Sequence, residues 1–258
     1  MSTTPTVSIV VPVRNEELLL PGCLAALQRQ DYAGSYELVV VDNGSTDRSA
    51  EIAHAAGARV VKEPRKGVVR ALRTGYAAVQ SDIIAATDAD SRVPPDWISR
   101  LVTDLTAQPG VVAAGGIYTF YDSPFWLRWG TLLANQLDWQ LLGMNMAMWR
   151  WAYEAIGGIR PDVNLGWDAE LGRQFRRAGR VVIDHKSVVE TSARRYQVDG
   201  LWYSLLRYRI NDWWLAISGR PLMFDFREIR NPLASRPARP WAVVAIAAVM
   251  LRWFLTGR

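Results

Sequence analysis

Apolar and polar positions along the first 117 residues form alternating blocks of two kinds. Short runs rich in Val and Ile alternate with longer segments in which apolar side chains recur every three or four residues. Strands are expected at residues 7–13, 38–41, 58–62, 83–87 and 111–114, and helices at residues 16–30, 46–56, 68–79 and 95–107. This order predicts an α/β fold with a mostly parallel sheet and helices on both faces. Such sheets bind ligands where their strands end, so the loops after strands are the candidate sites.

The second half of the chain has a different pattern, with long apolar segments that contain many Trp and Met residues. Residues 125–156 are expected to be helical, residues 168–178 to form a helix closed by Gly179, and residues 181–184 and 187–191 to form strands. From residue 201, aromatic and basic side chains alternate; a Pro- and Arg-rich linker (231–240) and an apolar tail (241–251) follow. The tail is shorter than the ~20 residues that span a bilayer. Since the polar N-terminus also differs from a signal peptide, we expect a cytoplasmic protein.

Composition excludes several kinds of site. The 258 residues include one Cys, Cys23, and two His, His54 and His185. An internal disulfide and a metal site built from Cys or several His are therefore excluded. The first 125 residues carry 11 basic and 14 acidic side chains, whereas the rest carry 19 and 11. A basic C-terminal half suits a partner with phosphate groups, whether nucleotide, nucleic acid or lipid headgroup.

Two carboxylates follow the fourth expected strand. Asp88 and Asp90 are two residues apart, so in an extended segment both side chains face the same way. Two such carboxylates repel each other unless a cation lies between them, and a hard divalent cation that shares its ligands with phosphate oxygens is the natural partner. The alternative is an ordinary loop, in which this pair is common.

Three further loops carry polar side chains at the same edge of the predicted sheet. Residues 12–17 and 41–47 follow the first two strands; the second loop fits either a ligand contact or a turn that caps a helix. Lys66 and Arg70 belong to a basic segment that either covers a diphosphate, with Gly67 allowing close backbone approach, or is a solvated face. Asp168 stands at a helix start, as a cap or as a carboxylate base.

Six segments in order resemble family 2 glycosyltransferases. They are residues 7–17 (VSIVVPVRNEE), 41–47 (VDNGSTD), 65–67 (RKG), 88–90 (DAD), 145–150 (NMAMWR) with 156–158 (IGG), and 166–171 (GWDAEL) followed by Arg173 and Gly179. The resemblance covers residues 7–195. It implies a GT-A fold, with a Rossmann-like sheet and a catalytic domain over residues 1–200. The nucleotide-binding part would span about 1–117 and the acceptor part about 118–200, followed by a helical extension over 201–258.

The resemblance also implies roles for individual residues. The pocket for the base and ribose would be lined by Pro12, Arg14, Glu16, Asp42 and Asp88. Asp90, together with Asp88, would bind Mg²⁺ or Mn²⁺, which neutralises the departing diphosphate. Asp168 would be the base that deprotonates the acceptor hydroxyl, with inversion at the anomeric carbon.

The chain departs from the family pattern at two places. Trp167 precedes Asp168 where a Glu is usual, so the acceptor pocket is expected to differ. Where many relatives have a His near the metal, this chain has Glu190 and Thr191, and His185 is expected to be a surface or turn residue. Arg194 and Arg195 follow, either as a pair that clamps the diphosphate or as solvated side chains.

The aromatic and basic segment 201–226 fits a membrane surface or a lipid acceptor. The alternative is a helical cap that completes the core or joins two copies in a homodimer. Stacking on nucleic acid is disfavoured by the acidic first half and the glycosyltransferase motifs.

The leading hypothesis is thus a bacterial, metal-dependent enzyme that moves a sugar, most often from a UDP-sugar, to a hydroxyl on a sugar or lipid-linked acceptor at the inner membrane face. Two alternatives stay open at this point. One is a retaining GT-A enzyme with a small soluble acceptor, and the other a non-catalytic binding protein on the same fold. The intact Asp42, Asp88, Asp90 and Asp168 count against the second.

Overall fold

The computed structural model describes residues 4–136 and 140–222, and all structural statements below refer to these ranges. The expected linker at 231–240 and the apolar tail at 241–251 lie outside them, as do the side chains of Phe224, Phe226 and Arg227.

Strands and helices alternate through the first half, as the hydrophobic pattern predicts. The strands are β1 (Val7–Val13), β2 (Tyr36–Asp42), β3 (Arg59–Lys62), β4 (Ile83–Ala86), β5 (Ser91–Arg92), β6 (Val111–Phe120), β7 (Met146–Trp149) and β8 (Arg180–Thr191). The helices are α1 (Leu20–Leu27), α2 (Ser49–Ala55), α3 (Val68–Ala77), α4 (Trp97–Thr106), α5 (Phe125–Asn135), α6 (Arg150–Ala155), α7 (Trp167–Ala178), α8 (Arg194–Asp199) and α9 (Leu201–Ser218).

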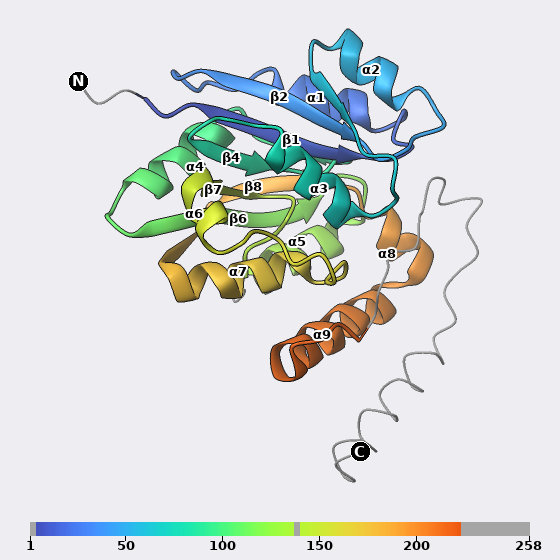
Figure 1. Ribbon diagram of the computed structural model, residues 1–258. Helices are drawn as coiled ribbons and strands as arrows, with labels where there is room; N and C mark the ends of the chain where they lie inside the picture. The colour runs from blue at the N-terminus through green and yellow to red at the C-terminus, as the bar shows by residue number, and fades with distance from the viewer. Residues whose placement is uncertain (1–3, 137–139, 223–258) are drawn as a thin grey trace.

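The described strands join in one sheet with the order β3-β2-β1-β4-β7-β6-β8-β5. The pairs β3–β2, β2–β1, β1–β4 and β6–β8 are parallel, whereas β7 is antiparallel to both of its neighbours and β5 is antiparallel to β8. The prediction of an α/β fold with a mostly parallel sheet is confirmed. The ends of β1, β2 and β4 therefore open on the same edge (Figure 1).

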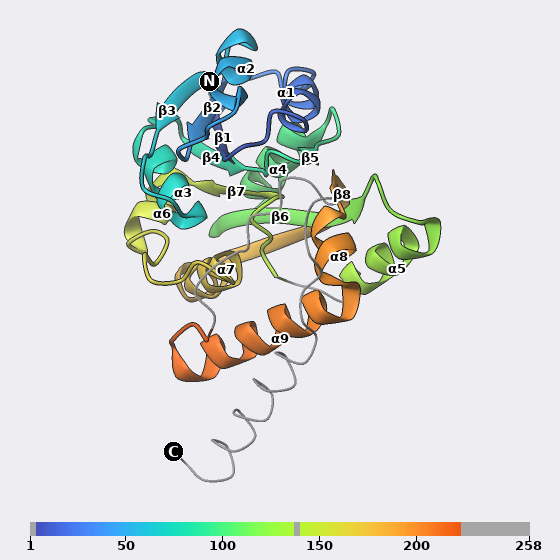
Figure 2. The same ribbon diagram turned by 90° about the vertical axis from the view of Figure 1, so that its right-hand side faces the viewer.

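Helices cover both faces of the sheet because successive strand residues point to opposite sides. Ile9 and Val11 pack with α1, α2 and α4, whereas Val10 packs with α3, α6 and α7. The interleaved β-branched strand residues make each strand apolar on both sides, which is typical of a sheet covered twice. Helix α9 lies at the end of the molecule opposite α2, and α8 joins it to the end of β8 (Figure 2).

The prediction of helix over residues 125–156 is wrong in part. Helices α5 and α6 are present, but the apolar run Met146–Trp149 between them is the central strand β7. A short apolar run buried on both faces cannot be assigned to helix or strand by periodicity alone. The two strands expected at 181–184 and 187–191 are one strand, β8, with an irregular register beside Gly116 and Ile117.

The aromatic and basic segment begins with an 18-residue helix, α9, which packs against α7. Leu215 on α9 is buried in the same core as Trp167 and Leu171. This part of the segment completes the core, as one alternative proposed.

The division into domains at residues 117 and 200 stays a prediction. No helix within the described ranges is long and apolar enough to cross a membrane.

We predict that Gly75→Ala destabilises the fold, because α3 lies directly on β1 and β2 at this residue. An added Cβ would be 2.5 Å from Val10 Cγ1 and 2.7 Å from Val41 Cγ2. Overpacking of this kind costs about 1–3 kcal/mol of the free energy of unfolding. The matched control is Gly130→Ala on α5, whose Cβ would meet no atom within 4 Å. Urea denaturation should show a loss for Gly75→Ala and none for the control; equal stability of the two variants would contradict the packing argument.

Candidate functional site

The parallel strands bring the sequence-predicted residues to one edge of the sheet. Pro12 pairs with Val41 and Val13 with Asp42, so the loops after β1 and β2 begin side by side. The loop that contains Asp88 and Asp90 follows β4, the other neighbour of β1. The three loops therefore surround the end of one strand (Figure 1).

Side-chain hydrogen bonds join the first two loops. Asn15, whose φ of 55° is in the left-handed region, accepts hydrogen bonds at Oδ1 from the Thr46 amide (2.7 Å) and hydroxyl (3.2 Å). The backbone amide of Asn15 donates a hydrogen bond to Ser45 Oγ at 3.1 Å. Asp42 Oδ1 accepts from the Ser45 amide at 2.9 Å, which is the turn expected as one alternative for Asp42. The role of Asp42 toward a base or ribose stays a prediction.

Asn43, whose role was not predicted from the sequence, holds the basic loop (residues 62–67) in place through hydrogen bonds. Its side chain is buried; Nδ2 donates to the carbonyls of Glu63 and Arg65, and Oδ1 accepts from the Gly67 amide at 2.8 Å. Arg14 Nη1 donates to the Asn43 carbonyl at 3.1 Å. An Asn in a short loop after a strand is the sequence signal for side-chain hydrogen bonds to the backbone of this kind.

The basic loop is also held from inside by Glu63. This buried carboxylate accepts hydrogen bonds from the Arg65 guanidinium and amide and from Thr74 Oγ1 at 2.7 Å. These donors lower the pKa of Glu63 to about 2, so the side chain is ionised at neutral pH. Lys66 and Arg70 are exposed on either side of Gly67, at the rim of the loop.

Asp88, Asp90 and Asp168 come together from two separate parts of the chain. Burial, followed by the charges of Asp90 and Asp168, raises the pKa of Asp88 well above its ordinary value, while Arg195 acts in the opposite direction. A buried carboxylate whose pKa is raised by burial and by neighbouring carboxylates is a candidate for a functional site. Carboxylate oxygens beside a phosphate-bearing ligand are the donors that Mg²⁺ and Mn²⁺ prefer, so Asp88 and Asp90 fit the expected metal.

Arg194 lies between two of the predicted site carboxylates. Its guanidinium donates two hydrogen bonds to Glu16, one of them 2.8 Å long, and its Nη2 is 3.0 Å from Asp90 Oδ2. Burial, together with the charges of Asp90 and Asp47, raises the pKa of Glu16 although the Arg194 guanidinium acts in the opposite direction. Thr191 Oγ1 donates to the other oxygen of Asp90 at 3.3 Å. The alternative that Arg194 is a solvated side chain is wrong, because only 15% of its side chain is exposed.

Asp168 lies in the first turn of α7, with its carboxylate held by backbone amides. Gly143 donates to Oδ2 at 3.0 Å and Ala169 to Oδ1 at 2.9 Å. The ring of Trp167 is buried in the core against Gly143, where a Cβ would be 2.4 Å from it. The structure therefore gives Trp167 a packing position next to Asp168 rather than an open surface for an acceptor.

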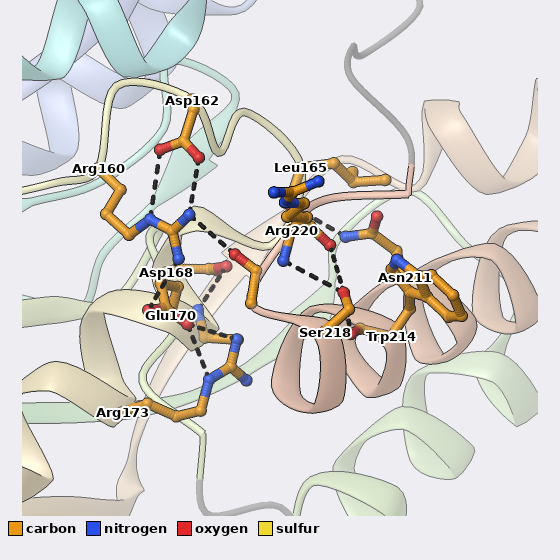
Figure 3. Close-up of polar contacts among 12 residues, drawn as sticks. Arg160, Asp162, Leu165, Asp168, Glu170, Arg173, Asn211, Trp214, Ser218 and Arg220 are labelled. Atoms are coloured by element: carbon orange, nitrogen blue, oxygen red, sulfur yellow. Dashed lines mark hydrogen bonds and ion pairs between the residues drawn. The ribbon is translucent and has the colours of Figure 1, made fainter. Parts of the chain in front are cut away.

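Helix α9 supports the turn that leads into Asp168 (Figure 3). The buried Asn211 donates from Nδ2 to the Leu165 carbonyl at 3.0 Å. A Cβ on the next residue, Gly166, would be 2.5 Å from Asp212 Oδ1. Arg160 joins the same region, donating to the Gly219 carbonyl at 2.9 Å and lying 3.6 Å from Glu170. These contacts were not predicted, because α9 is far from Asp168 in sequence.

Glu190, which stands where the resemblance leads to the expectation of a His, has a partner outside the predicted site. Glu190 accepts a hydrogen bond from Arg128 at 2.7 Å. Within the described ranges, no three His, Cys, Asp or Glu side chains form a ready cage for a metal ion. A surface groove of about 670 Å³ lies elsewhere, between α1, β5 and α5, and contains none of the predicted site residues.

Comparison with known proteins gives results that agree with this geometry. The family model described as glycosyl transferase family 2 matches residues 8–161. The undecaprenyl-phosphate 4-deoxy-4-formamido-L-arabinose transferase of Pseudomonas aeruginosa is 35% identical over 149 residues, which are 54% of this chain and 43% of that protein. The chain thus spans less than half the length of this relative.

Two solved structures share the fold. The mannosyltransferase PcManGT from Pyrobaculum calidifontis, in complex with GDP-Man and Mn²⁺, has a TM-score of 0.68 at 21% identity, covering 100% of this chain and 77% of that one. The glucosyl-3-phosphoglycerate synthase from Mycobacterium tuberculosis, in complex with Mg²⁺ and UDP, has a TM-score of 0.62 at 22% identity, covering 84% and 80%.

We predict that Glu63→Gln loosens the basic loop in a pH-dependent way. Because the folded-state pKa of Glu63 is below its unfolded value, its stabilisation is complete above that unfolded value and is lost as the pH falls toward about 2. Urea midpoints should differ most between wild type and variant at pH 7 and converge from about pH 4.5 downward. Glu51→Gln, in an exposed pair with Arg48, should show no such difference. A gap between wild type and Glu63→Gln that does not change with pH would contradict the role of the charge.

Proposed function

The chain belongs to glycosyl transferase family 2, and from this premise we propose that it transfers a sugar from a nucleotide-sugar to a hydroxyl of a lipid-linked acceptor. The reaction depends on Mg²⁺ or Mn²⁺ and inverts the anomeric carbon. The observation that carries the proposal is the arrangement of Asp88, Asp90 and Asp168, from a strand end and a helix start, in which the charges of the other two carboxylates act on the buried Asp88.

The donor is proposed to bind over the ends of β1, β2 and β4. Pro12, Arg14, Glu16 and Asp42 line the side toward the base and ribose, and Lys66 and Arg70 reach the diphosphate from the rim. UDP is the favoured nucleotide, and a GDP-sugar is the first alternative to test. The two fold neighbours support this range, since one is described with GDP-Man and the other with UDP.

One part of the site acts on the departing diphosphate and the other on the acceptor. The metal, when bound at Asp88 and Asp90, stabilises the negative charge on the departing diphosphate. Arg194 and Arg195 offer guanidinium donors to the same group. On the acceptor side, Asp168 takes the proton of the attacking hydroxyl, and the amides of Gly143 and Ala169 hold its carboxylate in place.

A lipid-linked acceptor is supported by the surface of the protein. Helix α5 exposes Phe125, Trp126, Trp129 and Leu133, each more than half exposed, and α9 exposes Trp213 and Ile217. Aromatic side chains of this kind favour the boundary between water and lipid. By its name, the P. aeruginosa relative acts on undecaprenyl phosphate. We therefore propose that the enzyme acts at a membrane surface, and the cytoplasmic face is the side expected from the sequence.

We predict that Asp168→Asn retains donor binding and loses turnover. The variant should show the wild-type rise in melting temperature with UDP- or GDP-sugar and Mn²⁺, because Asp168 faces the acceptor. Its rate of nucleotide release with bacterial membrane lipids should fall by about 10²–10⁴, the usual contribution of a general base. Asp90→Asn is the matched control and should lose the donor-induced shift, as should wild type in EDTA. Full turnover in Asp168→Asn would mean that the acceptor oxygen needs no base, as for a lipid phosphate.

We also predict that the double variant Trp126→Ser/Trp129→Ser binds membranes more weakly. Cosedimentation with vesicles of phosphatidylglycerol and phosphatidylcholine should show a fall in affinity of about tenfold or more, because two aromatic side chains no longer enter the interface. Trp151→Ser, which removes an exposed Trp on α6, should bind as wild type does. Equal binding by all three proteins would remove α5 from the membrane contact.

A further inference from the structure

Arg194 is a fixed positive charge at the position where the metal is needed. The turn before it is held by Asp122, which accepts hydrogen bonds from Ser192 Oγ and from the Ala193 amide. Its guanidinium contacts Glu16 and Asp90, and the side chains of all three residues are at most 17% exposed. Because a guanidinium is not deprotonated in proteins, Arg194 stays charged at any working pH.

A divalent cation on Asp90 must share that carboxylate with the guanidinium. Asp90 Oδ2 is 3.0 Å from Arg194 Nη2, and Oδ1 is 3.3 Å from Thr191 Oγ1, so both oxygens have a partner already. A metal ion at this carboxylate would meet a like charge at close range in a shielded site. The metal alone is thus opposed by Arg194.

The nucleotide changes this balance, because its diphosphate offers the guanidinium a new anionic partner. Arg194 can then leave Asp90 to the metal and pair with the phosphate oxygens, for which a planar guanidinium is well suited. We propose that Arg194 takes the metal's place on Asp90 in the free enzyme and so makes metal binding depend on the nucleotide. This inference rests on the proposed metal-dependent nucleotide-sugar site.

The test measures Mn²⁺ binding by electron paramagnetic resonance, with and without UDP or GDP, and needs no acceptor. Wild type should bind Mn²⁺ weakly alone and about tenfold or more tightly with the matching nucleotide, within the usual range of coupling between sites. Arg194→Gln should bind Mn²⁺ alone about tenfold more tightly than wild type does. Arg194→Gln also lacks the guanidinium that would contact the diphosphate. The factor by which nucleotide increases its Mn²⁺ affinity should therefore be at least tenfold smaller than in wild type.

Two further variants separate competition from a general effect of charge. Arg59→Gln removes the same charge from an ion pair at the opposite edge of the sheet, with Glu37, and should bind Mn²⁺ as wild type does. Arg194→Lys keeps the charge but cannot bridge two carboxylates, and should give intermediate values; it also serves if Arg194→Gln folds poorly. A nucleotide enhancement that is equal in wild type and both Arg194 variants would overturn the inference. Absence of nucleotide-dependent Mn²⁺ binding in every protein would instead refute the proposed function.

Discussion

Repulsion among four carboxylates is the constraint on which the site depends. Glu16, Asp88 and Asp90 come from two loops and Asp168 from the first turn of α7; burial, followed by the charges of the other three carboxylates, raises the pKa of Asp88. A fold that brings such groups together is stable only when cations or hydrogen-bond donors compensate the charge. In this structure, Arg194 compensates Glu16 and Asp90, and backbone amides compensate Asp168. A cluster of carboxylates of this kind is suited to bind a divalent cation together with a ligand that carries phosphate groups.

The loops around these carboxylates are shaped by hydrogen bonds from side chains to the backbone. Asn15 and Asn43 bond the main chain of neighbouring loops, Asp42 bonds the main chain of its own loop, and Glu63 bonds the turn that carries Lys66 and precedes Arg70. Loops at the end of a parallel sheet have no ladder partners for their amides and carbonyls, so short polar side chains take that role. Several motif residues that look like ligand contacts in the sequence thus also build the loop, and the two functions coexist.

The sequence predicts the first half of the fold well because each element there carries its own signal. The β-branched runs of β1, β2 and β4 and the helical spacing of α3 and α4 are local patterns, and the edge that they form follows from parallel pairing. Strand β7 could not be assigned, because Met146–Trp149 is apolar on every side and its strand state comes from pairing with β4 and β6. The convergence of Asp88 and Asp90 was likewise accessible from spacing, whereas the contacts of Arg194 and Asn211 depend on segments that meet only in three dimensions.

The residues that complete the site lie beyond the segment that the family model matches. That match ends at residue 161, whereas Asp168, Arg194 and Asn211 follow it. Arg194 reaches back across the sheet to Glu16, 178 residues earlier, and Asn211 supports the turn before Asp168 from α9. The matched segment supplies the proposed donor edge, whereas the proposed acceptor side and the charge balance of the proposed metal position come from the later segment. Differences in acceptor and in metal coupling among members of the family are therefore expected to arise there, where a change leaves the sheet and the nucleotide loops intact.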